Sequence, residues 1–480
     1  MLHEGTPGPI GRAPAPRGVR WAAWITGIVF NALTFWWIVR VPAHAMTQPW
    51  LIYPALLALA LYLGLFVALF GWIVRFARRR LAWPVLLLAP VAWITCEWLK
   101  SSGALGFPWA NLAYALASRP EWIQGASIAG APGLSLWIVS VNAAGAAAVV
   151  ARRWSERAAY AIIAAILVAV PVRWGEARLR TASPPRLERV VLVQSNIASE
   201  DKWNPAKQDS VVGTLYRMTR EAAALTPRPS LILWPETALP FYVRLEPAKL
   251  PRLLGLAREV GIPILAGYPD ALLTPRGDVI THNAAGIIRA TGTIGAQYEK
   301  IHLVPFGERI PFQGFFPFLH QIDLGQAEWT PGTRYVVFTG AGAAFGVLIC
   351  FESIFPDHAR RYALEGAQYL VNITNDEWFG RSAGPVQHAD MAILRSVELG
   401  LSTARCANTG ISMLIDPYGR VTDRTGLFEE ALLAGDLAAG VGPTRFMRWG
   451  DWLTPLCLGL TLILIAVAWF RPLQRMDAGR

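Results

Sequence analysis

The stretch Phe345-Gly346-Val347-Leu348-Ile349-Cys350-Phe351-Glu352 decides the fold that we expect for this chain of 480 residues. A short, uninterrupted apolar run is typical of a strand that is buried on both faces of a sheet. In sheets of that kind, reactive side chains lie where the strands end. We therefore predict an α/β domain in which Cys350 follows a central strand as a candidate nucleophile.

Two other predicted strands also end on ionisable side chains. Glu236 follows the run LILWP (231–235), and Lys300 follows the run IGAQYE (294–299). A thiol attacks only as the thiolate, and its ordinary pKa is about 8.5. A carboxylate can take the thiol proton as a general base, and an ammonium can stabilise first the thiolate and then an oxyanion. Together with Cys350, these residues would supply a base, a stabiliser and a nucleophile.

Each of these three residues also has an ordinary structural interpretation. A Cys at the end of an apolar strand is more often a small buried hydrophobic residue. Glu236 after Trp-Pro is more often a turn or helix-start residue, and Lys300 is more often an exposed strand end. Composition alone does not favour catalysis over these interpretations, so the surrounding sequence has to decide.

The composition indicates a membrane protein, because 54% of the residues are hydrophobic and 16% are charged, against about 25% charged in soluble chains. We expect a disordered cytoplasmic tail over 1–19, a transmembrane bundle of about five spans over 20–175, and a C-terminal transmembrane helix over 451–471. Apolar runs near the spanning length of roughly 20 residues occur at 21–39, 50–73, 81–99, 123–150, 158–172 and 452–470.

Basic residues set the predicted orientation of the spans. The Arg residues of 12–20, 75–80, 152–157 and 471–475 fall on one side if the spans alternate, and that side is the cytoplasm. The long region between the fifth and sixth spans then lies outside. The net charge of +11 gathers beside apolar runs rather than on a basic face with interleaved aromatic residues. We therefore expect no nucleic-acid partner.

The outer region, taken as 185–440, alternates predicted strands with predicted helices. This alternation indicates an α/β domain with buried sheets. The strands are expected at 190–193, 231–234, 264–266, 336–338, 345–349, 369–373 and 411–415, and the helices at 210–225, 247–260, 359–366 and 391–400. The four Cys and seven His residues show no metal-binding or disulfide spacing, so we expect no metal and no disulfide framework.

Three blocks of this sequence resemble the catalytic blocks of the nitrilase, or carbon–nitrogen hydrolase, superfamily in order and spacing. They are LILWPETA (231–238), YEKIHLVPFGE (298–308) and GVLICFE (346–352). The flanking membrane spans, with the stretches 196–205, 375–380 and 394–400, narrow the resemblance to the apolipoprotein N-acyltransferase family. It covers roughly residues 20–470 and implies an α-β-β-α sandwich on a membrane α-helical bundle. It also implies the bacterial inner membrane, with the catalytic domain on the periplasmic side.

The resemblance implies a role for each matching residue. Glu236 would be the general base, Lys300 the stabiliser and Cys350 the nucleophile. Glu308 would be a second essential carboxylate that orients Lys300, and Glu352 would be a supporting acid beside the nucleophile. The loops around the substrate entrance would carry Trp203, Trp378 and Phe379.

The resemblance also implies ping-pong chemistry without a cofactor. An acyl chain of a phospholipid, typically phosphatidylethanolamine, would pass to Cys350 as a thioester. It would then pass to the N-terminal amine of the diacylglyceryl-cysteine of an apolipoprotein. We expect a monomer. The segment 311–319 carries four Phe residues, and we predict a mobile lid whose apolar face meets acyl chains; the alternative is a hydrophobic loop packed on the sheet.

Two other functions fit parts of the sequence. A membrane-tethered nitrilase-type amidohydrolase would let water resolve the acyl-enzyme of a small amide, and a scaffold would use the fold without catalysis. The flanking spans and the Phe-rich segment favour lipid substrates, and the complete set of three residues argues against a scaffold. The sequence departs from the family in Phe351, where Tyr is common, and in having six predicted spans rather than about eight.

Overall fold

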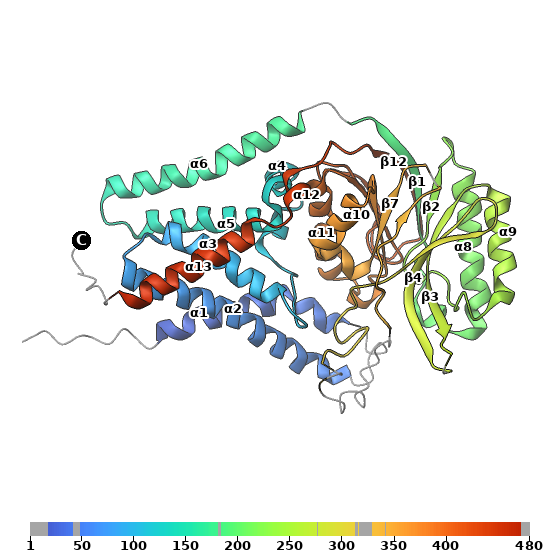
Figure 1. The fold of residues 1–480 in the computed structure, drawn as a ribbon, viewed down its shortest axis with the longest axis horizontal. Helices are drawn as coiled ribbons and strands as arrows, with labels where there is room; N and C mark the ends of the chain where they lie inside the picture. Colours follow the sequence, from blue (N-terminus) through green and yellow to red (C-terminus); the bar gives the residue numbers. More distant parts are fainter. Residues whose placement is uncertain are drawn as a thin grey trace, which may run out of the picture.

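The computed structural model describes residues 18–41, 49–180, 184–275, 277–312, 315, 329–340 and 342–471. A helical bundle and a two-sheet domain lie side by side along the long axis of the molecule (Figure 1). Most of the tail predicted over 1–19 lies outside the described residues. The α-β-β-α sandwich beside a helical bundle confirms the predicted fold class.

Helices occupy all six positions predicted for membrane spans. They are α1 (Gly18–Thr34), α2 (Ile52–Leu81), α3 (Val85–Ser101), α5 (Ala126–Val150), α6 (Trp154–Leu179) and α13 (Leu453–Phe470). Among the described residues, five segments are long and apolar enough to cross a membrane: 21–40, 49–81, 126–150, 154–179 and 453–470. Helix α3 is shorter, with 17 residues, and packs against α2, α5 and α13 inside the bundle.

The outer surface of the bundle is apolar, as a helix surface in contact with lipid must be. Helix α6 shows this most clearly, since Gly175 is its only buried residue. A Cβ at Gly175 would come 1.9 Å from the carbonyl oxygen of Glu121, so the helix can pack there only as glycine. Large exposed apolar side chains on the bundle include Leu57, Leu65, Trp72, Ile162, Ile166, Val170, Leu462 and Ile463.

In the described part of the chain, two six-stranded sheets form the sandwich. The first has the order β12-β1-β2-β3-β4-β5 and the second the order β11-β10-β9-β8-β7-β6. The first sheet contains β1 (Arg186–Gln194), β2 (Leu231–Leu233), β3 (Ile264–Leu273), β4 (Val279–Ile288), β5 (Ile294–Glu299) and β12 (Ala431–Ala438). The second contains β6 (Val337–Phe338), β7 (Phe345–Ile349), β8 (Tyr369–Thr374), β9 (Ser402–Ala407), β10 (Met413–Ile415) and β11 (Val421–Arg424).

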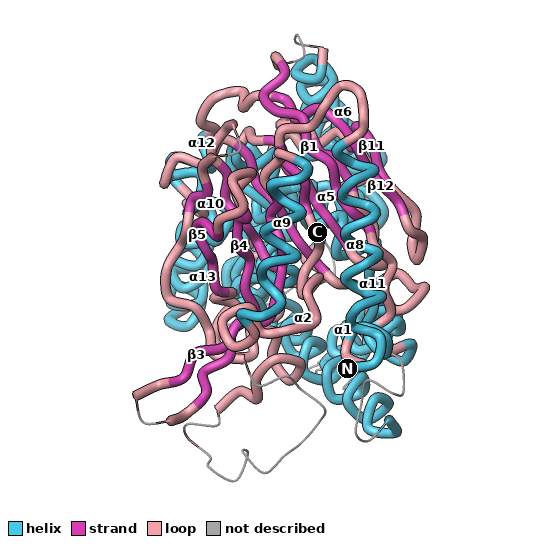
Figure 2. The backbone as a smooth tube through the Cα atoms, turned by 90° about the vertical axis from the view of Figure 1, so that its right-hand side faces the viewer, coloured by secondary structure: helices cyan, strands magenta, loops and turns pink. Residues whose placement is uncertain are grey.

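The central strands are apolar without alternation because both of their faces are buried. In β1, Val190 and Leu192 join the core between the two sheets, whereas Val191 and Val193 join a second core under the outer helices. Helices α8 (Gln208–Ala223) and α9 (Leu250–Val260) cover the first sheet, in front of the strands in Figure 2. Helices α10 (Pro356–Leu364) and α11 (Gly384–Leu399) lie between the second sheet and the bundle (Figure 1).

The sandwich is joined to the bundle where α5 is interrupted. Ala129 and Gly130 have non-helical backbone angles, and the freed N–H of Ala131 donates to Glu398 Oε1 at 2.9 Å. Glu398, on α11, is buried and paired with Arg395 at 2.7 Å. The break leaves a polar backbone group inside the protein, and the Glu398 carboxylate satisfies it.

A second junction lies beside helix α11. The indole N–H groups of Trp37 and Trp109 both donate to Gln387 Oε1, at 2.9 and 2.8 Å. Two charged residues of α3 hold the loop that carries Trp109: Glu97 accepts from Leu112 N, and Lys100 donates to the Trp109 carbonyl oxygen. Glu97 and Lys100, near the end of α3, therefore position the loop through which Trp109 contacts the sandwich.

Candidate active site

The structure brings the three predicted catalytic residues to one edge of the sandwich. Glu236 follows β2, Lys300 follows β5 and Cys350 follows β7. Lys300 Nζ lies 3.3 Å from Glu236 Oε1. The charges of Glu236 and Lys300 both act on the Cys350 thiol. The predicted base, stabiliser and nucleophile are therefore neighbours, although they are separated by 64 and 50 positions in the sequence.

The Glu236 carboxylate is held by donors from three parts of the domain. Oε1 accepts from Asn283 Nδ2 at 2.7 Å as well as from Lys300, and Oε2 accepts from Asn375 N at 2.9 Å. The residue is 6% exposed. A buried carboxylate with these partners stays in one orientation, as a general base requires.

Lys300 bridges two carboxylates. Its Nζ donates to Glu308 Oε1 at 2.8 Å, and Glu308 Oε2 accepts from Val304 N at 2.8 Å. Burial alone would lower the pKa of Lys300, but the carboxylates of Glu308 and Glu236 outweigh it and raise the pKa. Lys300 is therefore a fixed ammonium, and Glu308 is placed to orient it.

Cys350 has a strained backbone and a thiol whose pKa is raised. Its φ of 52° lies in the left-handed region, where residues other than glycine are uncommon and often functional. Desolvation raises the pKa of the Cys350 thiol far above its ordinary value, the Glu236 carboxylate raises it further, and Lys300 offsets this only in part. The thiol therefore needs a base at the moment of attack, which Glu236 can supply.

The buried carboxylate of Glu352 accepts hydrogen bonds from the segments that flank Cys350 and follow Lys300. Its Oε2 accepts from Ile349 N at 2.8 Å, and its Oε1 accepts from Ile301 N at 2.8 Å and from Tyr298 Oη at 2.7 Å. The side chain is 0% exposed. It therefore ties the start of the Cys350 turn to the segment that follows Lys300, and it has no surface with which to touch substrate.

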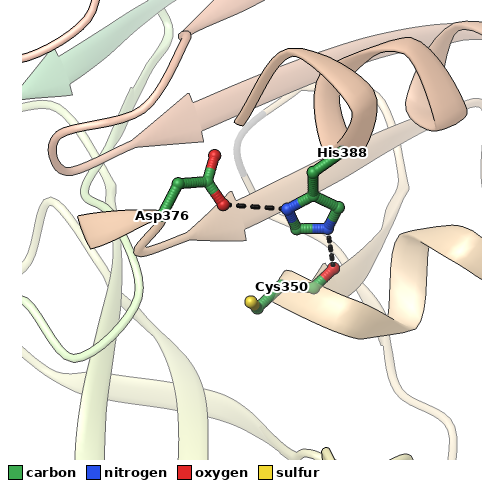
Figure 3. A group of neighbouring side chains, drawn as sticks. All are labelled: Cys350, Asp376 and His388. Carbon is green, nitrogen blue, oxygen red and sulfur yellow. Dashed lines mark hydrogen bonds and ion pairs between the residues drawn. The ribbon is translucent and has the colours of Figure 1, made fainter. Parts of the chain in front are cut away.

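Three residues that the sequence did not single out support the Cys350 backbone. His388 Nε2 donates to the Cys350 carbonyl oxygen at 3.1 Å, and His388 Nδ1 lies 2.8 Å from Asp376 Oδ1. Asp376 Oδ2 accepts from Arg405 at 2.7 Å. Figure 3 shows the Cys350 sulfur pointing away from His388. The network therefore holds the nucleophile through its backbone carbonyl oxygen, and the sulfur points away from His388.

The same cluster has the donor atoms of a metal site. The possible ligand atoms of Cys350, Asp376 and His388 all lie within 4.8 Å of one another. However, the Arg405 guanidinium is bonded to Asp376 and also lies 3.1 Å from His388 Nδ1. A buried positive charge at that position opposes a cation, so we interpret the cluster as a hydrogen-bond network.

Lys202 is a further cation beside the base. It ends helix α7 (Ser199–Lys202) and is 1% exposed, and its Nζ has no hydrogen-bond partner among the described residues. Burial lowers the pKa of Lys202 to about 8, against the opposing effect of the Glu377 and Glu236 carboxylates. An unpaired buried ammonium is costly, and such groups gather at functional sites.

Replacing Lys202 by Met is expected to raise the thermal midpoint and to lower the rate of covalent reaction at Cys350 at least about tenfold. The midpoint should rise because the change removes a buried, unpaired charge. The rate should fall because the change removes a positive charge that stabilises the negative charge developing in the transition state beside Glu236. Scanning calorimetry and intact mass would measure both effects, with exposed Lys207→Met as the control. A lower midpoint with an unchanged rate would show that Lys202 is purely structural.

The two predicted entrance loops lie against each other. Ser199 N donates to both Glu377 carboxylate oxygens at 2.9 Å, which joins α7 to the turn η9 (Glu377–Phe379). Trp203 and Trp378 are 48% and 47% exposed. The Phe379 ring packs against Trp37 of the bundle, with ring centroids 4.9 Å apart.

Most of the predicted Phe-rich lid, namely residues 313, 314 and 316–319, lies outside the described residues. Phe312 and Phe315 are described and are 42% and 83% exposed. The lid therefore remains a prediction.

Comparisons with known proteins agree with this geometry. The family model described as carbon-nitrogen hydrolase matches residues 189–446, and the model described as apolipoprotein N-acyltransferase N-terminal domain matches residues 10–144. Among solved structures, an amidase from Nesterenkonia sp. AN1 is 21% identical, with a TM-score of 0.41, over 54% of this chain and 94% of that one. The carbon-nitrogen hydrolase model covers more than half of the chain, and this match places the chain in the carbon–nitrogen hydrolase class.

Full-length relatives narrow the class to one family. Apolipoprotein N-acyltransferase of Geobacter metallireducens is 33% identical over 462 residues, which is 95% of this chain and 88% of the relative. The protein of that name from Bradyrhizobium diazoefficiens is 33% identical over 86% of this chain and 79% of the relative. The chain belongs to the apolipoprotein N-acyltransferase family, which confirms the resemblance seen in the sequence.

Proposed function

We propose that this protein transfers an acyl chain from a membrane phospholipid to the N-terminal amine of a diacylglyceryl apolipoprotein, through a thioester on Cys350. The proposal rests on two features that occur together in this chain, a candidate catalytic site and a membrane-spanning bundle. A Glu–Lys–Cys site lies at the strand ends, and the sandwich that holds it is docked on helices long enough to cross a membrane. Substrates anchored in a bilayer require a catalytic domain held at its surface.

The first half-reaction forms the thioester. Glu236 takes the Cys350 proton as the sulfur attacks the ester carbonyl carbon of the phospholipid. The carbonyl electron pair moves to oxygen, and the Lys300 ammonium stabilises the resulting oxyanion. When the intermediate collapses, the ester C–O bond breaks, and the proton on Glu236 passes to the departing lysophospholipid oxygen.

The second half-reaction forms the amide. The acceptor amine attacks the thioester carbonyl carbon, and Glu236 takes a proton from the attacking nitrogen. Collapse breaks the C–S bond, and that proton returns to the Cys350 sulfur. No cofactor is needed in either half-reaction. Glu236 transfers the proton and Lys300 stabilises the oxyanion in both of them.

The proposed location is the inner membrane of a bacterium, with the sandwich on the periplasmic side. The five apolar helices support a membrane protein, and the Arg-rich loops at 75–80 and 152–157 support the side. Phosphatidylethanolamine is the proposed donor, and the proposed working state is a monomer.

A transfer assay tests the proposal against hydrolysis of a small amide. Purified protein would be given phosphatidylethanolamine labelled in its acyl chains, and then either a diacylglyceryl peptide with a free amine or the same peptide with its amine acetylated. We expect label on the free-amine peptide alone. Release of free fatty acid with no labelled peptide, together with cleavage of short amides, would show a hydrolase instead.

A further inference from the structure

A cavity of about 440 Å³ lies at the junction of bundle and sandwich, and none of the residues proposed for acyl transfer lines it. It is within the size range of small-ligand sites. Figure 1 shows α12 (Arg445–Trp449), which contributes to the cavity, at this junction. The lining residues are Ser127, Ile128, Trp174, Arg178, Thr444 and Arg445.

The cavity lies where three apolar helices leave the bundle on the side of the sandwich. Helix α5 begins at Ala126, α6 ends at Leu179 and α13 begins at Leu453. The lining residues come from the start of α5, from the end of α6, and from the start of α12 with its N-cap Thr444. Three tryptophans with exposed side chains lie at or near these helix ends, and tryptophan is enriched at the headgroup depth of membranes. They are Trp174, Trp449 and Trp452.

The charge of the cavity suits an anion. Its lining contains two arginines and neither Asp nor Glu. Arg178 is held in place by hydrogen bonds to Ser127 Oγ and to the Gln124 carbonyl oxygen, and its guanidinium lies over the rings of Trp174 and Tyr418 at 5.6 and 5.7 Å. A fixed guanidinium can offer paired N–H groups to a phosphate.

An apolar ridge leads along α6 to Arg178. Ile162, Ile166 and Val170 are 58%, 54% and 62% exposed, and Trp174 and Arg178 continue the same spacing of four residues. Side chains four apart form a ridge on a helix surface. Acyl chains lying along this ridge would place a lipid headgroup at the cavity.

We propose that this cavity binds the phosphate of a bilayer glycerophospholipid, with Arg178 and Arg445 as its ligands, as a site separate from the acyl-transfer centre. The bound lipid would stabilise the docking of the sandwich on the bundle. Thr444, in the lining, donates its hydroxyl to the Glu398 carbonyl oxygen, and the Glu398 carboxylate accepts from Ala131 N at the break in α5. A lipid in the cavity would therefore contact the bundle helices α5 and α6 as well as α12, which packs on the sandwich.

Thermal unfolding of the full chain in detergent tests the site. Every sample would carry Cys350→Ala, so that acylation cannot contribute to the shift. We expect dioleoylphosphatidylglycerol to raise the midpoint on the order of 3 °C, increasing with lipid concentration. We expect dioleoylglycerol, which has the same chains without phosphate, to give no such rise. Equal shifts from both lipids, or the same shift from inorganic phosphate alone, would overturn the proposal.

Variants locate the effect. Arg445→Gln should remove most of the phosphatidylglycerol shift, and the double variant with Arg178→Gln should remove all of it. Arg173→Gln is the matched control, because Arg173 is an exposed cation near the same end of α6, paired with Glu176 and outside the cavity. If Arg178→Gln fails to fold, Arg445→Gln alone decides. A full shift in Arg445→Gln, or an equal loss in Arg173→Gln, would contradict the site.

Discussion

Replacing Glu236 by Gln is expected to lower the rate of thioester formation by about 10³-fold, which is the size of effect that a lost general base produces. Gln keeps the volume of the side chain and can still accept a hydrogen bond from Asn283 or Lys300. It cannot take the thiol proton, and the pKa of the Cys350 thiol is raised too far for spontaneous ionisation near neutral pH. Single-turnover intact mass with phospholipid would measure the rate.

The control for Glu236→Gln is Glu259→Gln, a surface carboxylate paired with Arg220. That variant should keep the wild-type rate. The thermal midpoint of Glu236→Gln should fall, because the Gln amide nitrogen would face a donor such as Asn375 N and the buried pair with Lys300 is lost. The rate is therefore compared on folded protein at a temperature below both midpoints. A variant that acylates at the wild-type rate would assign the base to another group and would remove Glu236 from the mechanism.

Replacing Asp376 by Asn is expected to destabilise the protein by about 3–5 kcal/mol, the usual cost of leaving one partner of a buried ion pair uncompensated. Arg405 and Asp376 are both 0% exposed and lie 2.7 Å apart. The thermal midpoint should therefore fall by roughly 10 °C. Acylation by the remaining folded protein should fall as well, since His388 would lose the partner that orients it toward the Cys350 carbonyl oxygen.

The buried pair also predicts how stability depends on pH. Burial would raise the pKa of Asp376, but Arg405 and His388 outweigh it and lower the pKa from 3.8 to about 2. A carboxyl whose pKa is lower in the folded state stabilises the protein above the unfolded pKa. Its contribution should therefore be lost as the pH falls from about 4 to 2 in the wild type, and it should be absent in Asp376→Asn.

A double-mutant cycle measures how much of the lost stability comes from the interaction between Asp376 and Arg405 rather than from each side chain alone. Asp376→Asn combined with Arg405→Gln should be more stable than the sum of the two single changes predicts. The exposed pair Arg217–Glu430 serves as the control, and its cycle should show little coupling. Additive losses at Asp376 and Arg405 would contradict the interpretation of a coupled buried pair.

The parts of the fold that the sequence predicted are those with a strong local signal. Strands buried on both faces, such as β1, β7 and β8, appear as continuous apolar runs. The helices of the bundle appear as long apolar segments. Strands β4, β9, β11 and β12 were not predicted. Strand β11 is exposed along its whole length, and β12 contains a glycine and has two buried residues, Leu433 and Leu437.

The residues of the candidate site also differ in whether the local sequence indicates them. Glu236, Lys300 and Cys350 could be found because each follows a predicted strand within a block resembling a known superfamily. Asn283 was missed because it lies within β4, a strand that the sequence analysis did not identify. The other missed residues, Asp376, His388 and Arg405, have no motif in common, and only the packing of β8, β9 and α11 brings them beneath the nucleophile.

Intact-mass measurement of the purified protein after incubation with phosphatidylethanolamine tests the central claim most directly. The account predicts a mass increase of one acyl chain in the wild type, its removal by neutral hydroxylamine, and its absence in Cys350→Ala. A folded wild-type protein that gains no acyl chain from any phospholipid would contradict it, as would an adduct that persists in Cys350→Ala.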